Sequence, residues 1–257
     1  FFDLEALIFG AHEKSEYVSF THSPDLGTVL HLIDRDPSNA QQKPQVFHAP
    51  SFFCFHTVNS FDSDDGEKFI TDLVTFKDPQ VVRDLLLKNL TSDPQLLAHE
   101  TLSTACLTRL TLDKKDGVCE TEVLSDFSAI GDFLELPTIN PDLTMDPNYK
   151  YVYGICAAHR PSRLANGLAK VNVESGDVEG VWCEPGHIPT ELRFIPRPGA
   201  TAQDDGVLVS LVTAPDGARS FCLVLDGKTF DVLAKAYFRE GHRLPYGFHG
   251  TFVPGRA

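Results

Sequence analysis

The stretch SFDSDDGEKFITDLVTF, residues 60–76, carries the turn chemistry that decides the fold class. Asp65-Gly66 separates two apolar segments, and glycine accepts the positive φ that tight hairpin turns need. The second segment, 68–76, is rich in β-branched and aromatic side chains, which favour strands. The stretch therefore predicts a β-hairpin.

The Asp-Gly pair recurs along the chain, each time beside apolar or alternating segments, at 116–117, 205–206, 216–217 and 226–227. Turns that recur about every 10–15 residues are typical of an antiparallel meander, so we expect an all-β fold. A sandwich, a barrel and a propeller all fit this pattern. The expected strands are 28–35, 68–76, 108–112, 149–158, 168–173, 206–214, 220–226 and 232–238.

One segment, DPQVVRDLLLKNL at 78–90, has a helical pattern. Asp78 is placed as its N-cap and Pro79 as its first helical residue, positions that these residue types favour. Its apolar residues repeat at helical spacing. We therefore expect a single helical insert in a β protein. The expected apolar stripe is Val81, Val82, Leu85, Leu86 and Leu90.

The totals restrict the partners and the organisation of the chain. It has 257 residues and a net charge of −14, from 22 basic and 36 acidic side chains. An acidic surface repels phosphate backbones, so nucleic acid is excluded as an expected partner. Because no linker interrupts the chain, we expect residues 1–257 to form a single domain.

Six cysteines are present without a CxxC pair, and several lie in apolar segments. This predicts reduced, buried thiols and a reducing compartment, which favours the cytoplasm and leaves a plastid open. No apolar run is long enough to cross a bilayer. The chain opens on FFDLEALIFG without an initiator Met, so we expect it to begin partway through a longer protein.

Two of the ten histidines stand in apolar surroundings. His56 lies in FFCFHTVNS, and a strand over 52–59 would place it on one face with Phe52, Cys54 and Val58. His249 lies in YGFHG, between glycines that permit close backbone approach. Each could be a hydrogen-bonded core histidine or a metal ligand. The surface is expected for His12, His99, His187 and His242, and a loop for His159.

Two glutamates bear on that choice. Glu135 lies in an apolar, strand-like stretch, and Glu191 directly precedes an apolar strand. A buried carboxylate is costly unless it is paired. A carboxylate that accepts the free ring N–H of a metal-bound histidine is one such pairing. A salt bridge from Glu191 to Arg193 or Arg197 is the alternative.

Five stretches, in this order, resemble the carotenoid cleavage oxygenase family, and the resemblance runs from near residue 1 to near residue 252. They are FFCFHTVNSFDSDDG (52–66), FLELPTINP (133–141), YVYGICAA (151–158), PTELRFIPRPGATAQDDGVLVSLV (189–212) and LPYGFHGTF (244–252).

The resemblance implies a seven-bladed β-propeller with one Fe(II) on its axis, held by four histidines. Three of these are hydrogen-bonded to glutamates. His56 and His249 match two iron ligands, and Glu135 and Glu191 match the glutamates paired with them. Phe53, Phe55 and Phe248 are candidates for the substrate pocket, because they neighbour the ligands in sequence.

The resemblance covers only the C-terminal half of the family's propeller. The other two histidines and the third glutamate are expected in an N-terminal half, either as a separate chain or as a part missing from this fragment. The sequences around His12, His22 and His31 do not match the motifs that hold the family's iron ligands. The family uses O2 to cut a carbon–carbon double bond in carotenoids, apocarotenoids or stilbenes, and gives aldehyde or ketone products.

The resemblance predicts an Fe(II) dioxygenase that cleaves a carotenoid or apocarotenoid. Two alternatives stay open: a stilbene-cleaving oxygenase of the same fold, and a metal-free propeller that acts as a binding scaffold. The partners implied are an apolar polyene or stilbene, O2 and the N-terminal half. Peripheral contact with a membrane stays open.

Overall fold

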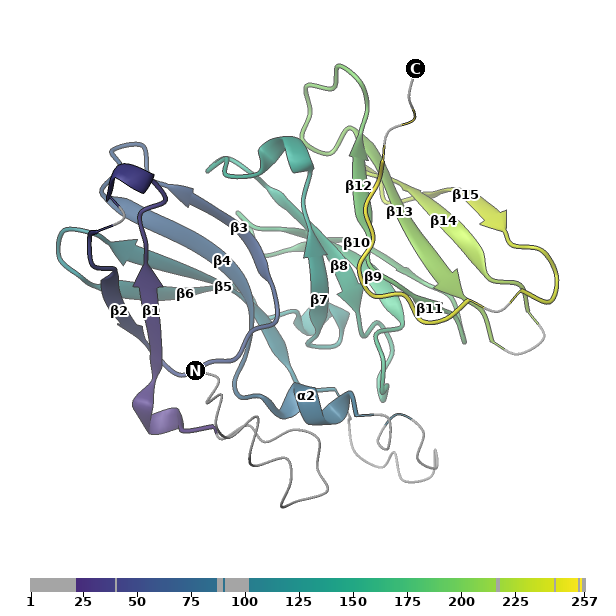
Figure 1. The fold of residues 1–257 in the computed structure, drawn as a ribbon. Coiled ribbons are helices and arrows are strands. Elements are labelled where there is room, and N and C mark those ends of the chain that lie inside the picture. Colours follow the sequence, from purple (N-terminus) through teal and green to yellow (C-terminus); the bar gives the residue numbers. More distant parts are fainter. Residues whose placement is uncertain are drawn as a thin grey trace.

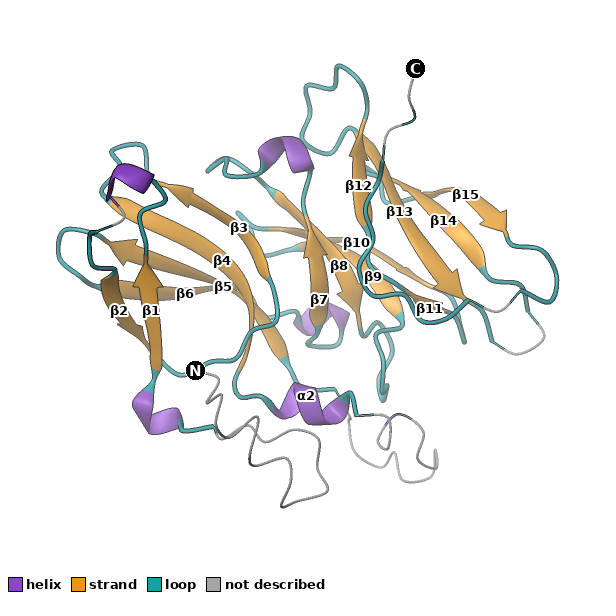
Figure 2. Cartoon of the chain, viewed as in Figure 1, coloured by secondary structure: helices purple, strands orange, loops and turns teal. Residues whose placement is uncertain are grey.

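The computed structural model describes residues 22–39, 41–86, 90, 102–215, 218–242, 244–253 and 255. Strands dominate these residues and the helices are short (Figure 2). The predicted all-β class is therefore confirmed. The helical elements are α2 (Gln80–Asp84) and the 3-10 turns η2 (Pro24–Leu26), η3 (Pro37–Asn39), η5 (Ser128–Ile130) and η6 (Pro141–Leu143).

Three antiparallel sheets follow one another in chain order and lie side by side (Figure 1). The first comprises β3 (Thr57–Asp62), β4 (Lys68–Phe76), β5 (Ala105–Asp113) and β6 (Cys119–Ser125). The second comprises β7 (Leu134–Thr138), β8 (Tyr151–Cys156), β9 (Gly167–Asn172) and β10 (Val178–Cys183). The third comprises β11 (Ile188–Pro189), β12 (Arg193–Pro196), β13 (Gly206–Thr213), β14 (Phe221–Asp226) and β15 (Val232–Tyr237).

Consecutive strands are neighbours in the first two sheets, so each of these sheets is a meander of local hairpins. In the third sheet β11 and β12 both pair with β13. A further two-stranded sheet of β1 (Thr28–Leu32) and β2 (Gln45–Ala49) contacts β6. Repeated four-stranded meanders are typical of propeller blades. The number of seven blades stays a prediction.

The positive φ expected at the Asp-Gly turns is found at two of the four described glycines, but not at Gly206, which begins β13, or at Gly227, where Phe230 instead takes a φ of 64° in the β14–β15 turn. Gly66 joins β3 to β4 with a φ of 70°, and Gly117 joins β5 to β6 with the same φ. These left-handed conformations cost glycine nothing, because it has no Cβ. The expected turn at 216–217 lies outside the described residues.

The strand expected over 52–59 is wrong in its bounds, because β3 begins only at Thr57. Upstream, Phe53 forms one isolated bridge with Phe76, and the chain then leaves the ladder until Val74 donates its backbone N–H to the His56 carbonyl. The pairing register shifts again after Thr57. The alternation of faces predicted for 52–59 therefore does not hold, and His56 stands at the entry to β3.

The helix expected over 78–90 is also shorter than predicted, since α2 ends at Asp84. Asp78 does accept a hydrogen bond from the backbone N–H of Gln80, at 2.9 Å, as a capping side chain would. Of the predicted apolar stripe, Val81 is fully buried and Val82 packs against the core, whereas Leu85, the residue after the helix, is 40% exposed. Residues 87–89 lie outside the described residues, and Leu90 is again helical.

The first two sheets are joined by a buried polar cluster. Asp72 on β4 is fully buried and accepts two hydrogen bonds from the Arg109 guanidinium, at 2.8 and 2.7 Å. It also accepts a hydrogen bond from the hydroxyl of Tyr149, a residue that precedes β8. Burial and the Asp72 carboxylate raise the pKa of Tyr149, so its hydroxyl stays protonated. The cluster ties the sheet of β4 to that of β8.

The cysteines are all free, as predicted, but only Cys156 is buried. Burial raises the pKa of Cys156 to about 12, so it stays a thiol at physiological pH. Within the ranges described above, no helix has the length and apolar character needed to traverse a membrane.

Candidate metal centre

Four predicted residues meet where the inner edges of the three sheets approach one another. His56 enters β3, Glu135 belongs to β7, and Glu191 lies between β11 and β12. His249 follows β15 in the sequence, but the segment 244–253 runs back beside β12 (Figure 1). Residues up to 193 positions apart therefore share one location.

His56 and Glu135 form the first pair. Glu135 is 5% exposed, and its Oε2 accepts a hydrogen bond from His56 Nδ1 at 2.6 Å. The same oxygen accepts the backbone N–H of Leu136 at 2.8 Å. Leu136 has a φ of 48°, and the β7–β8 register shifts after Glu135. At this bulge the chain leaves the β7–β8 ladder, which directs the Glu135 carboxylate at the His56 imidazole.

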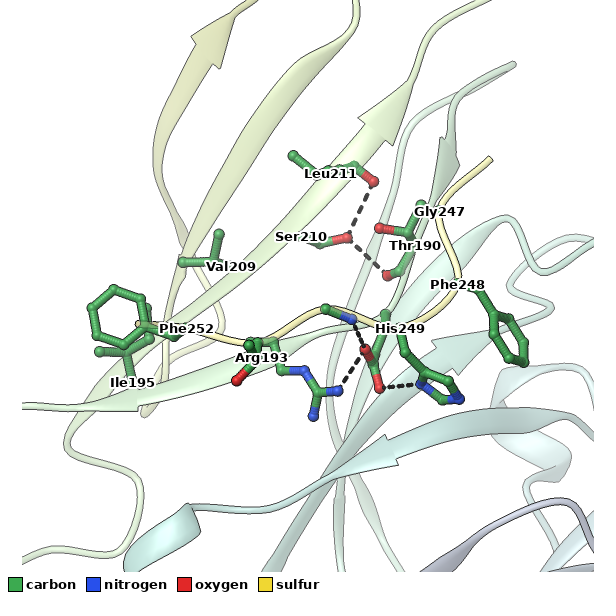
Figure 3. Close-up of a pocket in the computed structure, with 13 residues that line it drawn as sticks. Thr190, Arg193, Ile195, Val209, Ser210, Leu211, Gly247, Phe248, His249 and Phe252 are labelled. Carbon is green, nitrogen blue, oxygen red and sulfur yellow. Dashed lines mark hydrogen bonds and ion pairs between the residues drawn. The ribbon is translucent and has the colours of Figure 1, made fainter. Parts of the chain in front are cut away.

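His249 and Glu191 form the second pair. Glu191 is 8% exposed, and its Oε1 accepts a hydrogen bond from His249 Nδ1 at 3.0 Å. Its Oε2 accepts the backbone N–H of Gly250 at 2.9 Å and pairs with Arg193 Nη2 at 2.7 Å. Figure 3 shows Arg193 and His249 both directed at this carboxylate. Glu191 thus contacts His249 and also makes the salt bridge to Arg193 that was the alternative.

The glycines beside His249 differ in their surroundings. A Cβ added to Gly247 would lie 3.1 Å from Thr190 Cγ2, so this residue does permit a close approach to the segment before Glu191. A Cβ on Gly250 would meet nothing within 4 Å. Gly250 matters through its backbone N–H instead. The hydrogen bonds from the backbone N–H groups of Leu136 and Gly250 could not be predicted from the sequence, because every residue except proline has such a group.

The carboxylates fix how each imidazole can act. An ionised carboxylate only accepts hydrogen bonds, so Nδ1 of each ring carries the proton and Nε2 of the neutral ring presents a lone pair. The two Nε2 atoms face each other at 3.4 Å. Two converging lone pairs repel unless a cation lies between them.

The spacing suits a shared metal ion. Imidazole nitrogens bind a first-row metal such as zinc at about 2.1 Å, so two adjacent ligands at angles of about 90–110° lie roughly 3.0–3.4 Å apart. The observed 3.4 Å falls in that range. Within the described residues, no group of three or more His, Cys, Asp or Glu side chains forms a complete metal site. The two imidazoles therefore fit part of a ligand set.

Despite their apolar surroundings in the sequence, neither histidine is fully buried. The His56 side chain is 23% exposed and that of His249 is 46% exposed. The Glu135 and Glu191 carboxylates behind the rings are buried. Each imidazole therefore lies at the surface, with its Nε2 atom directed away from its glutamate. The hydrogen bond that His56 donates to Glu135 raises the pKa of His56, while partial burial of the ring lowers it.

The three phenylalanines predicted near the pocket have different environments. Phe53 packs against the core, whereas Phe55 is 42% exposed and Phe248 is 64% exposed. The Phe248 ring lies 4.2 Å from the His249 ring, between centroids, and the Phe55 ring lies 6.3 Å from the His56 ring. A pocket of about 230 Å³ beside Glu191 is lined by Phe248 but by neither of the other two.

The other histidines that the structure describes stay outside this centre. His22 hydrogen-bonds Ser51, His159 is exposed in a loop beside Cys183, and His242 is exposed, as predicted for the last two. His187 differs from the surface expectation, because its side chain is only 12% exposed and packs on Phe221. His12 and His99 lie outside the described residues.

Comparisons with known proteins agree with one another. The family model for retinal pigment epithelial membrane protein matches residues 2–254. A chloroplastic carotenoid cleavage dioxygenase 8 of Arabidopsis thaliana is 34% identical over 251 residues, which are 94% of this chain and 42% of that protein. The apocarotenoid-15,15'-oxygenase of Synechocystis is 29% identical over 249 residues, covering 96% of this chain and 46% of that protein.

A solved structure extends the likeness to three dimensions. The cobalt-substituted apocarotenoid oxygenase of Synechocystis matches with a TM-score of 0.73 at 25% identity, over 91% of this chain and 45% of that one. A structure in which cobalt has been substituted has a metal site. The chain spans about half the length of the curated relatives it matches.

Proposed function

The chain belongs to the retinal pigment epithelial membrane protein family, and we propose that it forms the C-terminal half of a non-haem Fe(II) dioxygenase. The enzyme cleaves a carbon–carbon double bond of a carotenoid or apocarotenoid with O2, and gives aldehyde or ketone products. The observation that carries the proposal is the convergence of His56 Nε2 and His249 Nε2 at 3.4 Å, each ring backed by a buried glutamate.

His56 and His249 would hold the iron in this proposal. Two further histidines come from the other half of a seven-bladed propeller, as the resemblance implies. Neutral imidazoles leave the metal its full charge and leave positions for other ligands. Iron held there would activate O2 toward the alkene, and because each oxygen atom ends in one carbonyl product, no net electrons from the metal are consumed.

The residues of this chain prepare the site for that metal. Glu135 and Glu191 accept hydrogen bonds from the Nδ1–H groups, which fixes the tautomer and directs each Nε2 lone pair away from its glutamate. The Leu136 and Gly250 N–H groups hold the carboxylates in turn. None of these groups donates a proton to the substrate, because the reaction needs none.

The exposed aromatic rings supply an apolar approach to the centre. Phe55 and Phe248 are both exposed and stand next to the two imidazoles. Apolar rings favour contact with a polyene, whose carbon chain carries no hydrogen-bonding groups. Substrate would thus lie against these rings while the metal is held at its side.

The test of the proposal is product analysis with the protein expressed at its full natural length. It is loaded with Fe(II) and incubated under O2 with β-carotene, an apocarotenal and resveratrol in separate reactions. Aldehydes from either of the first two substrates support the proposal. Cleavage of resveratrol alone, or no cleavage by an iron-loaded protein, would refute it.

A further inference from the structure

The two buried glutamates of the centre have different electrostatic partners. Glu191 pairs with a cation, since Arg193 Nη2 lies 2.7 Å from its Oε2. Glu135 has no comparable cation among the described residues. Its Oε1 is buried without any hydrogen-bond partner there, while Oε2 accepts both His56 and Leu136.

The histidine contacts differ in the same sense. The carboxylate without a cation lies 2.6 Å from its imidazole, and the carboxylate with Arg193 lies 3.0 Å from its imidazole. The guanidinium of Arg193 holds Oε2 of Glu191 by a charge-assisted contact, so Oε1 is the oxygen left to accept from His249. His56 and His249 are therefore held by carboxylates that are fixed in different ways.

Arg193 is also placed to set the direction of the Glu191 carboxylate. It follows Glu191 by two residues and opens β12, whose pairing with β13 begins at Arg193 and Val209. The backbone of Arg193 is thus fixed by the sheet. Its side chain then holds Oε2 while Oε1 faces His249 (Figure 3).

We propose that Arg193 is a positioning residue of the metal centre, which keeps the Glu191 carboxylate aimed at His249. The inference rests on the proposed function, because it assumes that His249 binds a metal. It adds a residue that acts through Glu191 and has no counterpart beside Glu135 among the described residues. Loss of Arg193 would leave a buried carboxylate without its counterion, a state that proteins avoid by reorientation of the side chain. Reorientation of Glu191 would weaken the hold on His249.

The first experiment measures Co²⁺ and Fe²⁺ affinity of the full-length protein by titration. Arg193→Met is expected to weaken binding about tenfold, the lower end of losses for groups behind a metal ligand. Arg193→Lys restores the charge and is expected to recover affinity to within about threefold of wild type, because lysine is a point charge without the guanidinium fork. Thermal melting of each variant checks the fold.

Arg197→Met is the matched control. Arg197 lies four residues further on, is 64% exposed and pairs with Asp205 rather than with the centre. Its loss removes one positive charge from the same region, so it reports any general effect of net charge on metal binding. We expect no change in affinity.

The second experiment separates positioning from a general structural effect. In a Glu191→Gln background Arg193→Met should change metal affinity by less than about twofold, since the anion it acts on is gone. In a Glu135→Gln background the full effect of about tenfold should persist. A wild type that binds no metal would overturn the proposed function itself. If wild type binds metal normally, three results would overturn only the role of Arg193. They are a metal affinity unchanged in Arg193→Met, no recovery of affinity in Arg193→Lys, and an equal loss of affinity in both backgrounds.

Discussion

At the scale of single residues, each imidazole is made competent by one carboxylate oxygen. Glu135 Oε2 and Glu191 Oε1 accept hydrogen bonds from the Nδ1–H groups of His56 and His249, so both Nε2 atoms are left to bind. The carboxylates are buried while the rings are partly exposed. Burial strengthens each hydrogen bond, because water competes weakly there.

Glu135→Gln is therefore expected to lower metal affinity by roughly 10–100-fold. Glutamine keeps the size of the side chain but removes the charge that favours the Nδ1–H tautomer. Metal titration of the full-length protein measures the effect. Glu174→Gln is the control, because Glu174 is 62% exposed and pairs with Lys150 away from the centre. Equal affinities for wild type and Glu135→Gln would show that Glu135 serves the fold alone.

The pKa of His56 gives a pH dependence in the metal-free protein. Because the hydrogen bond to Glu135 raises that pKa above its usual value near 6.5, the pair contributes stability below that pH and loses it as pH rises through the folded pKa. The melting temperature of wild type should exceed that of Glu135→Gln by more at about pH 6 than at about pH 9. A difference that grows with pH would contradict the assignment.

At the scale of elements, the centre lies where edge strands from three sheets meet. β3, β7 and the β11–β12 pair are each at one edge of their sheet. Their relative placement depends on contacts between sheets, among which the Asp72 cluster joins the first sheet to the second. The contribution of this contact between the two sheets to stability is thus separate from metal binding.

Tyr149→Phe is expected to destabilise the protein by about 1–3 kcal/mol, because it leaves one hydrogen bond of a fully buried carboxylate unmade. Urea unfolding measures the change, and metal affinity should stay the same. Tyr237→Phe is the control, since Tyr237 is 52% exposed. A loss of metal affinity without a loss of stability would place Tyr149 in the centre instead of in the contact between the two sheets.

Strands with plain alternation or long apolar runs could be predicted from the sequence. The bounds of β4 match the expected 68–76, and β13 differs from its expected range by one residue. The entry to β3 could not be predicted, because its register depends on an isolated bridge to Phe76. The helix α2 ends before its predicted limit, because Val81 and Val82 of the apolar stripe meet the core whereas Leu85 is exposed.

The pairing of residues in the centre came from the resemblance and agrees with the geometry, since His56 contacts Glu135 and His249 contacts Glu191. Arg193 could be named from the sequence as a partner of Glu191, but not the sharing of one carboxylate between Arg193 and His249. That arrangement depends on where the segment 244–253 crosses β12, which no local pattern encodes.

At the scale of the whole molecule, apolar side chains are exposed on the C-terminal segment that carries His249. Phe248, Phe252 and Val253 of this segment are 64%, 52% and 76% exposed. Exposed apolar groups beside polar ones mark sites of interaction. The chain also spans about half of the relatives it matches. We propose that the other half of the propeller covers this surface and completes the ligand set.

The iron content of the purified full-length protein, compared with that of His56→Ala and His249→Ala, tests the central claim most directly. Wild type is expected to hold one iron per polypeptide, and each variant to lose it while its circular dichroism spectrum stays that of a folded β protein. A folded wild type that cleaves substrate without bound metal, or variants that keep their iron, would contradict the account.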